Sequence, residues 1–270
     1  MGILESIATV MVELWENRRR LFRLSVYDLK NQHGGTVLGF LWNFLNPAFQ
    51  VLVYWFVFAI GLRQGGDVDG VSYVVWLTAG IVCWTYTNGA MVGSDMSIIG
   101  FADVLKRMRF PIAIVPAKVV VSNFITHIVS MAVVFLVIFI TGTPIGTNVW
   151  LLPYYIFANT FFVLGYSLLA SSITVLFRDF HNISNTVFRF LFFISPVMWM
   201  PPEDDQLLCT IMKFNPFAYI LNGYRDALFY DWSLADNLET GLIFWAIAIA
   251  FFIAGCVLHM RLRNKFIDTL

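Results

Sequence analysis

Four basic residues lie beside long apolar segments of this chain and are candidates for binding an anionic phosphate group. They are Arg23, Lys30, Arg178 and Arg189. An arginine guanidinium suits phosphate because its N–H groups can donate to two phosphate oxygens at once. The alternative for each residue alone is an anchor at membrane headgroups, since Lys and Arg concentrate on the cytoplasmic side of membrane proteins.

A polar stripe runs along the first apolar segment. Asn43, Asn46, Gln50 and Tyr54 follow one another at spacings of three, four and four residues, which places them on one face of a helix. Polar groups within lipid cost free energy unless they meet protein partners or water. The stripe therefore lines an aqueous path or forms hydrogen bonds to another helix, and the sequence favours neither.

Aromatic rings are a further candidate binding feature. They make up 17% of the residues, including 27 Phe. Trp42, Trp84, Tyr86 and Trp199 are candidates for stacking against sugar rings along the same path. The alternative is an ordinary place at the membrane interfaces, where Trp and Tyr are common.

Several kinds of chemistry lack their sequence motifs. The dipeptide Gly-Lys never occurs, so the chain cannot form a P-loop for ATP, and neither H-E-x-x-H nor G-x-S-x-G is present. Cys83, Cys209 and Cys256 form no CxxC pair, so we expect no disulfide and no metal site. No Asp or Glu lies in the middle of an apolar segment, which argues against ion-coupled transport. We expect no catalytic residue and no cofactor in this chain.

Six apolar segments must position the candidate residues. Hydrophobic residues make up 59% of the chain and charged residues 13%, against about 25% charged in soluble domains. A bilayer core needs roughly 20 apolar residues of helix; most of the segments reach that length, and the fifth is short. We predict an all-α integral membrane protein whose six spans are Leu38–Leu62, Val71–Ser94, Pro111–Thr141, Val149–Phe177, Thr186–Met200 and Glu239–Arg261.

The basic residues are distributed asymmetrically among the connecting segments. Of the 17 Lys and Arg residues, only Arg63, Lys213 and Arg225 lie on the second face of the predicted bundle. The positive-inside rule makes the basic face cytoplasmic and places both termini in the cytoplasm. We expect a multi-pass membrane protein in contact with lipid and with no nucleic-acid partner.

The segments outside the spans divide the chain further. Residues 1–37 predict an amphipathic helix and linker at the cytoplasmic interface, with an ordinary soluble amphipathic helix as the alternative. Residues 38–262 form the six-span domain, and residues 263–270 form a cytoplasmic tail. Within the domain we expect a short cytoplasmic helix at about 96–110, and re-entrant helices at about 201–232 that dip into the outer leaflet.

Several stretches of the chain resemble the membrane subunits of ABC-2 type polysaccharide exporters, and more closely the wall teichoic acid export permeases of Gram-positive bacteria. The similarity runs nearly end to end. The matching stretches include Gly39–Pro47 (GFLWNFLNP), Tyr54–Arg63 (YWFVFAIGLR), Phe110–Pro116 (FPIAIVP), Val175–Asp179 (VLFRD), Phe193–Trp199 (FISPVMW), Gly223–Ala227 (GYRDA) and Leu258–Phe266 (LHMRLRNKF).

The resemblance implies a complex and a substrate. Two copies of this chain would pair with two copies of a cytoplasmic ABC ATPase, which binds ATP and Mg²⁺, in the bacterial plasma membrane. They would move an undecaprenyl diphosphate-linked teichoic acid outward, with another lipid-linked polysaccharide, such as O-antigen or capsule, as the alternative. The four basic residues named above would then attract the diphosphate of the lipid carrier. The coupling helix of the family maps onto about 96–110, so its charged residues are implied contacts to the motor. These are Asp103, Lys106, Arg107 and Arg109.

Three rival functions remain for comparison. An ion-coupled carrier would transport substrate as the purified chain alone, and a membrane enzyme acting on a lipid-linked glycan would alter its substrate chemically. A passive assembly scaffold would tolerate mutation of the polar stripe.

Overall fold

The computed structural model describes residues 2–32, 35–57, 66–107, 110–200 and 205–269, and these residues are almost entirely helical. The helices are α1 (Ile3–Glu16), α2 (Arg18–Gln32), η1 (Gly39–Leu41), α3 (Trp42–Trp55), α4 (Tyr73–Asp95), α5 (Ser97–Gly100), α6 (Ala102–Arg107), α7 (Ile114–Thr141), η3 (Val149–Leu151), α8 (Leu152–Leu176), α9 (Phe180–Ile194), α10 (Gln206–Lys213), α11 (Pro216–Phe229) and α12 (Leu238–Thr269). Two short strands, β1 (Asp67–Val68) and β2 (Val71–Ser72), pair as an antiparallel hairpin before α4. The predicted all-α class is therefore confirmed apart from this hairpin.

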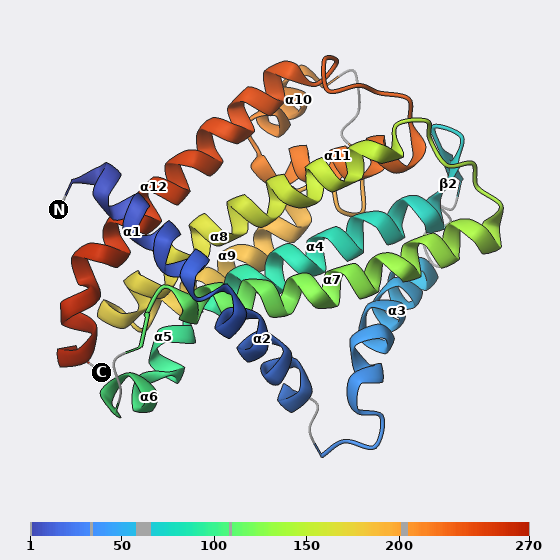
Figure 1. Ribbon diagram of the computed structural model, residues 1–270. Coiled ribbons are helices and arrows are strands. Elements are labelled where there is room, and N and C mark those ends of the chain that lie inside the picture. Colours follow the sequence, from blue (N-terminus) through green and yellow to red (C-terminus); the bar gives the residue numbers. More distant parts are fainter. Residues whose placement is uncertain (1, 33–34, 58–65, 108–109, 201–204, 270) are drawn as a thin grey trace.

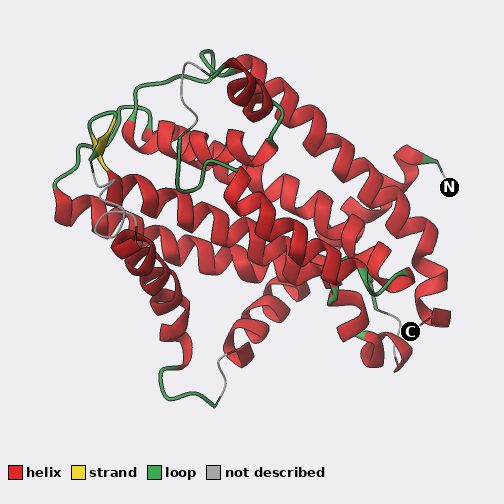
Figure 2. Ribbon diagram, turned by 180° about the vertical axis from the view of Figure 1, so that it is seen from behind, coloured by secondary structure: helices red, strands yellow, loops and turns green. Residues whose placement is uncertain are grey.

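The long helices form a bundle with two distinct ends (Figure 1). One end carries both chain termini, α5, α6 and the start of α7, and we call it the terminal end. The opposite end carries the hairpin, the loop between α7 and α8, and α10. Figure 2 shows from behind that α2 and α3 leave the body of the bundle as two separate arms.

Three helices of the described residues are long and apolar enough to cross a membrane by length and composition. They are Ile114–Thr141, Val149–Leu176 and Leu238–Arg263. The six-span prediction is therefore not confirmed as a count. The described parts of α3 and α9 have 14 and 15 residues, short of the roughly 20 that a bilayer needs, and α3 runs towards residues outside the described part.

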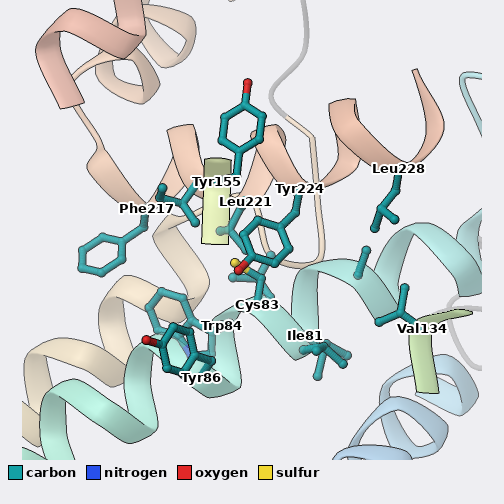
Figure 3. Packing of buried hydrophobic residues seen from close by; sticks show 14 of the residues in the cluster. Ile81, Cys83, Trp84, Tyr86, Val134, Tyr155, Phe217, Leu221, Tyr224 and Leu228 are labelled. Atoms are coloured by element: carbon teal, nitrogen blue, oxygen red, sulfur yellow. The ribbon is translucent and has the colours of Figure 1, made fainter. Parts of the chain in front are cut away.

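Helix α4 is long but lies mostly inside protein. Of its 23 residues, 17 are buried, and they pack against α7, α8, α9 and α11. Figure 3 shows Ile81, Trp84 and Tyr86 of this helix packed among core side chains from α7, α8 and α11. Polar groups of α4 find partners within the core: Thr87 Oγ1 donates to Asn159 Oδ1 at 3.2 Å. A helix covered by protein can carry such groups at little cost.

Helices α8 and α12 cross at two glycines. A Cβ on Gly165 would lie 2.7 Å from the backbone nitrogen of Phe252, and a Cβ on Gly255 would lie 2.5 Å from the carbonyl oxygen of Gly165. The absence of side chains at both positions lets the two backbones approach, which is a common way of packing helices within membranes.

Arg225 lies buried among α4, α11 and the segment after α9. Its side chain is only 2% exposed. Nη1 donates to the carbonyl oxygen of Pro196 at 2.6 Å and Nη2 to that of Val197 at 2.7 Å, while the guanidinium carbon lies 3.3 Å from the ring centroid of Trp76. These carbonyls follow the end of α9, where no helical donor remains, so Arg225 supplies the missing hydrogen bonds.

The N-terminal helix α1 packs on the terminal end of α12. Val10 is fully buried there, and Ile7 and Leu14 pack beside it. Glu13 accepts from Nη1 and Nη2 of Arg263 at 3.4 and 3.3 Å. Met11 and Trp15 on an adjacent face of α1 are exposed. This exposed strip is typical of a helix at a membrane interface.

Replacing Arg225 with Met should destabilise the protein by roughly 2–4 kcal/mol, because two buried carbonyls lose their donors at about 1–3 kcal/mol each. Gly80→Ala should destabilise it similarly, since the added Cβ would collide with the Arg225 guanidinium and with the Val197 carbonyl oxygen. Gly93→Ala on the same helix is the matched control, because its Cβ would meet Val119 at an ordinary 3.4 Å. Thermal unfolding in detergent measures all three, and equal stability of the two alanine variants would contradict the packing described.

The docking of α1 should weaken as pH rises. Burial raises the pKa of Glu13 above its ordinary value of 4.5, an effect larger than the opposing attraction of Arg263. The Glu13 carboxyl therefore binds its proton more tightly when α1 is docked than when it is not. Docking is strongest below about pH 4.5 and weakens progressively as the pH rises through the raised pKa of Glu13. Hydrogen-exchange protection of α1, corrected for intrinsic rates, should show this trend. Glu13→Gln should abolish it, whereas Glu16→Gln at an exposed position of α1 should not.

Candidate coupling surface and substrate path

The segment predicted as a coupling helix is helical in two short pieces, α5 and α6, rather than one. Asp103, Lys106 and Arg107 all lie exposed on α6, while Arg109 lies outside the described residues. None of the ion pairs among the described residues involves these three side chains, so their charges face solvent. The structure therefore presents a small charged surface at the terminal end.

A separate apolar cluster anchors this surface to the bundle. Leu105 of α6 and Ile98 of α5 pack with side chains from the start of α7 and the ends of α8 and α12. The buried members are Ile98, Leu105, Ile112, Val115, Val175, Leu262 and Phe266. A displacement of α6 would therefore be transmitted to three long helices at once, because packed side chains resist independent movement.

Lys118 links the coupling segment to α2. Its Nζ lies 2.7 Å from Asp28 Oδ2 on α2 and 4.9 Å from the ring centroid of Phe101, between α5 and α6. Two hydroxyls reinforce the joint: Ser25 Oγ donates to the Lys118 carbonyl oxygen at 3.0 Å, and Ser122 Oγ donates to the Ser25 carbonyl oxygen at 3.1 Å. This joint could not be predicted from the sequence, because Asp28 and Lys118 are far apart along the chain.

Asp95 forms a second buried joint near the coupling segment. Its side chain is fully buried at the end of α4, and Oδ2 lies 3.5 Å from His181 Nδ1 on α9. Beside it, Tyr166 and Ser184 share a hydrogen bond of 2.8 Å between their hydroxyl oxygens. The joint connects the end of α4 and the middle of α8 with the start of α9, and no motif in the sequence marks it.

The four candidate diphosphate-binding residues are all exposed. Arg23 and Lys30 lie on α2, Arg178 lies between α8 and α9, and Arg189 lies on α9. None of them forms an ion pair with a described acidic residue. Their positive charges are therefore available to an anion, although they belong to two different regions and do not form one cluster.

The polar stripe of α3 divides between two environments. Gln50 faces α4, where its Oε1 accepts from Thr85 Oγ1 at 3.2 Å, as the hydrogen-bonding alternative predicts. Trp42 and Asn46 line an open cleft of about 550 Å³ together with Thr36–Leu38. The side chains of Asn43 and Tyr54 lie outside the described part of the structure. Within this one stripe, Gln50 thus contacts α4 and Asn46 lines the cleft.

The aromatic candidates are not gathered into one path. Trp84 packs against Phe188, Phe192 and Phe217 in the core, and the Tyr86 hydroxyl donates to Thr160 Oγ1 at 2.9 Å. Trp199 lies after α9, where its Nε1 donates to the Phe193 carbonyl oxygen at 2.8 Å. Trp42 alone lines the cleft beside α3. Within this single chain, Trp84 and Tyr86 therefore serve packing.

Two helices expose broad apolar faces. On α3 these include Phe49, Leu52, Val53 and Phe56, and on α9 they include Ile183, Val187, Phe190 and Phe193. Contiguous apolar surface of this kind indicates contact with lipid or with another protein chain.

Comparison with known proteins places these features in a family. Residues 19–229 match the family described as ABC-2 type transporter. The chain is 26% identical over 260 residues to the O-antigen export system permease protein RfbA of Myxococcus xanthus, covering 96% of this chain and 98% of that protein. It is 25% identical over 244 residues to the protein of the same name from Klebsiella pneumoniae, covering 90% and 92% respectively. The chain therefore belongs to the ABC-2 type transporter family and is a membrane permease of that family.

Proposed function

We propose that this chain is the membrane subunit of an ATP-driven exporter that moves a lipid-linked polysaccharide of the O-antigen kind from the cytoplasmic to the outer side of the plasma membrane. The observation that carries the proposal is the nearly full-length similarity to permeases named for O-antigen export. The teichoic acid substrate favoured by the sequence resemblance is the alternative, because the relatives' names favour O-antigen instead.

The energy for transport comes from a separate subunit. Membership of the ABC-2 family implies an ABC ATPase partner. We assign two copies of that ATPase to two copies of this chain, with α6 as the contact surface. Asp103, Lys106 and Arg107 are exposed there, and Leu105 connects the surface to α7, α8 and α12. ATP binding in the partner would thus shift the permease between two arrangements.

The substrate enters at the cytoplasmic leaflet in this proposal. A diphosphate cannot cross hydrocarbon without a hydrated path, since charge in lipid is very costly. The exposed Arg178 and Arg189 attract it beside α9, while the undecaprenyl tail stays in the bilayer. Two copies of the chain meet through apolar faces of α3 and α9 and enclose the path, with Trp42 and Asn46 near its entrance.

The membrane topology follows from the same assignment. Helices α3, α4, α7, α8, α9 and α12 make six crossings, and the terminal end with both termini lies in the cytoplasm. The opposite end, with α10 and α11, lies on the outer side. The support is the distribution of charge, because the basic residues concentrate at the terminal end.

Reconstitution tests the function and its substrate together. We expect the chain alone to hydrolyse no ATP, and the complex with its ATPase to hydrolyse ATP faster when undecaprenyl diphosphate-linked O-polysaccharide is present in the proteoliposomes. Stimulation by a lipid-linked polyol phosphate instead would replace O-antigen by teichoic acid. Failure to associate with any ABC ATPase would overturn the exporter proposal.

Double replacement of Lys106 and Arg107 by Glu should reduce stimulated hydrolysis by about tenfold, because charge reversal at α6 repels the motor. Arg19→Glu, at an exposed site of α2, is the matched control.

A native cysteine tests the topology. Cys209 on α10 is partly exposed, whereas Cys83 and Cys256 are buried. A membrane-impermeant maleimide should therefore label the wild-type protein in sealed right-side-out vesicles, and Cys209→Ser should remove the label. Labelling that requires permeabilised vesicles would place α10 in the cytoplasm and reverse the orientation.

A further inference from the structure

A pocket of about 370 Å³ lies between α10, α11 and the start of α12 at the opposite end of the bundle. It is separate from the cleft beside α3 and from the coupling surface. Its volume falls within the range of about 300–1,000 Å³ that is usual for small-molecule sites. The lining residues that matter here are Lys213, Tyr219, Asn222, Asp226, Trp232 and Asn237.

Trp232 offers an aromatic face to this pocket from a loop that is already ordered. The indole side chain is 54% exposed. Asn148 Nδ2 donates to the Trp232 carbonyl oxygen at 3.1 Å, and the preceding residue, Asp231, accepts from the Thr147 backbone nitrogen at 3.1 Å and from its Oγ1 at 2.6 Å. These hydrogen bonds hold the pKa of Asp231 below its ordinary value, so the carboxylate stays charged and keeps its donors. A ligand that binds to Trp232 would therefore lose little free energy to the ordering of this loop.

A second turn fixes the other side of Trp232. Asp236 Oδ2 accepts from the Ser233 backbone nitrogen at 2.7 Å and from Ser233 Oγ at 2.8 Å. On the floor of the pocket, Tyr219 is nearly buried, and its hydroxyl lies 3.1 Å from the Tyr154 hydroxyl. The walls of the pocket are thus held by hydrogen bonds on both sides of the aromatic face.

Polar groups converge on the same pocket. Asp226 Oδ2 accepts from Asn237 Nδ2 at 3.0 Å, which orients both side chains. Asn222 is exposed one turn earlier on α11 and has no side-chain hydrogen bond to another residue of the described chain. An amide and a carboxylate beside an aromatic ring supply donors and acceptors for hydroxyl groups, together with an apolar face for the C–H side of a sugar ring.

The charge of the pocket selects against phosphate. Lys213 is its one cation among the described lining residues, and its Nζ already pairs with Glu239 Oε2 at 2.8 Å. With Asp226 beside this pair, the three side chains together carry a net negative charge at neutral pH; the buried Arg225, whose positive charge also acts on Asp226, does not line the pocket. A phosphate group would be repelled, whereas a neutral sugar would not be.

We propose that this pocket binds a neutral pyranose unit, stacked on Trp232 and hydrogen-bonded to Asn222 and Asp226. The assignment of that sugar to an exported polysaccharide on the outer side rests on the proposed function, whereas the binding of a sugar by the pocket does not. A site of this composition also favours a neutral glycan over a polyol phosphate as the transported chain.

The test uses Cys209, which lines the same pocket, as a reporter. The full chain is assembled with its ATPase partner in nanodiscs, and maleimide modification of Cys209 is timed with methyl glucoside, methyl mannoside, methyl N-acetylglucosaminide or glycerol phosphate. At least one glycoside should slow modification several-fold, and glycerol phosphate should not. Saturation-transfer NMR on the same samples should show contact to the protective glycoside.

Variants separate a binding role from a structural one. Trp232→Ala should weaken protection by roughly tenfold, since aromatic anchors dominate small binding sites. Trp150→Ala is the matched control, because Trp150 is also highly exposed at this end and does not line the pocket. Asn222→Ala gives a second measure at an exposed position, in case Trp232→Ala disturbs the loop. No protection and no NMR contact for any glycoside, or protection by glycerol phosphate alone, would overturn the proposal. Sugar binding without ATP-driven export would instead leave the pocket standing and refute the proposed function.

Discussion

The burial of the Arg225 guanidinium is the constraint on which the opposite end of this protein depends. A buried positive charge is costly unless nearly every donor finds an acceptor, and here the acceptors are backbone carbonyls just past the end of α9. The ring of Trp76 on α4 covers the charge from one side. A single side chain therefore connects α4, α11 and the end of α9. The same contacts hold in place the helix α11 that lines the pocket.

The terminal end is organised differently. Its joints are two ion pairs, Lys118 with Asp28 and Arg263 with Glu13, together with the apolar cluster around Leu105. These joints tie α1, α2 and α6 to the long helices through side chains that remain partly in contact with solvent. Such contacts are weaker than a fully desolvated network, so this end is better suited to movement. A motor bound at α6 would act on the end of the protein that is held by the weaker contacts. Leu105 connects this contact surface to α7, α8 and α12.

The two ends also differ in the chemistry they offer to a substrate. Basic side chains without acidic partners, such as Arg178 and Arg189, suit the diphosphate of a lipid carrier. In the pocket at Trp232, Lys213 is paired with Glu239, and Asp226 adds a further carboxylate. This arrangement suits a neutral sugar. A lipid-linked polysaccharide carries both groups in one molecule. The charge difference between the ends thus accords with a substrate whose diphosphate and whose sugars interact with different parts of the protein.

The helical class, the membrane setting and the family could all be predicted from the amino-acid sequence alone. These depend on segment length, apolar composition and motifs such as Gly39–Pro47, all of which are local along the chain. The sequence also predicted that the segment around Lys106 would be helical and charged. The number of crossings could not be confirmed in the same way, because α4 is enclosed by protein and the described parts of α3 and α9 are short.

Which polar and aromatic residues pack in the core and which remain exposed depends on the three-dimensional arrangement of the helices. Charge counting gave only the side of the membrane on which Arg225 lies, whereas its burial follows from acceptors at Pro196 and Val197 that come from another helix end. Composition could not separate Trp84, enclosed by phenylalanine rings, from Trp232, exposed beside a pocket. Periodicity likewise could not divide the α3 stripe between Gln50 and Asn46. The physical reason is common to all three: the free energy of a polar or aromatic side chain depends on partners that the chain brings from distant positions.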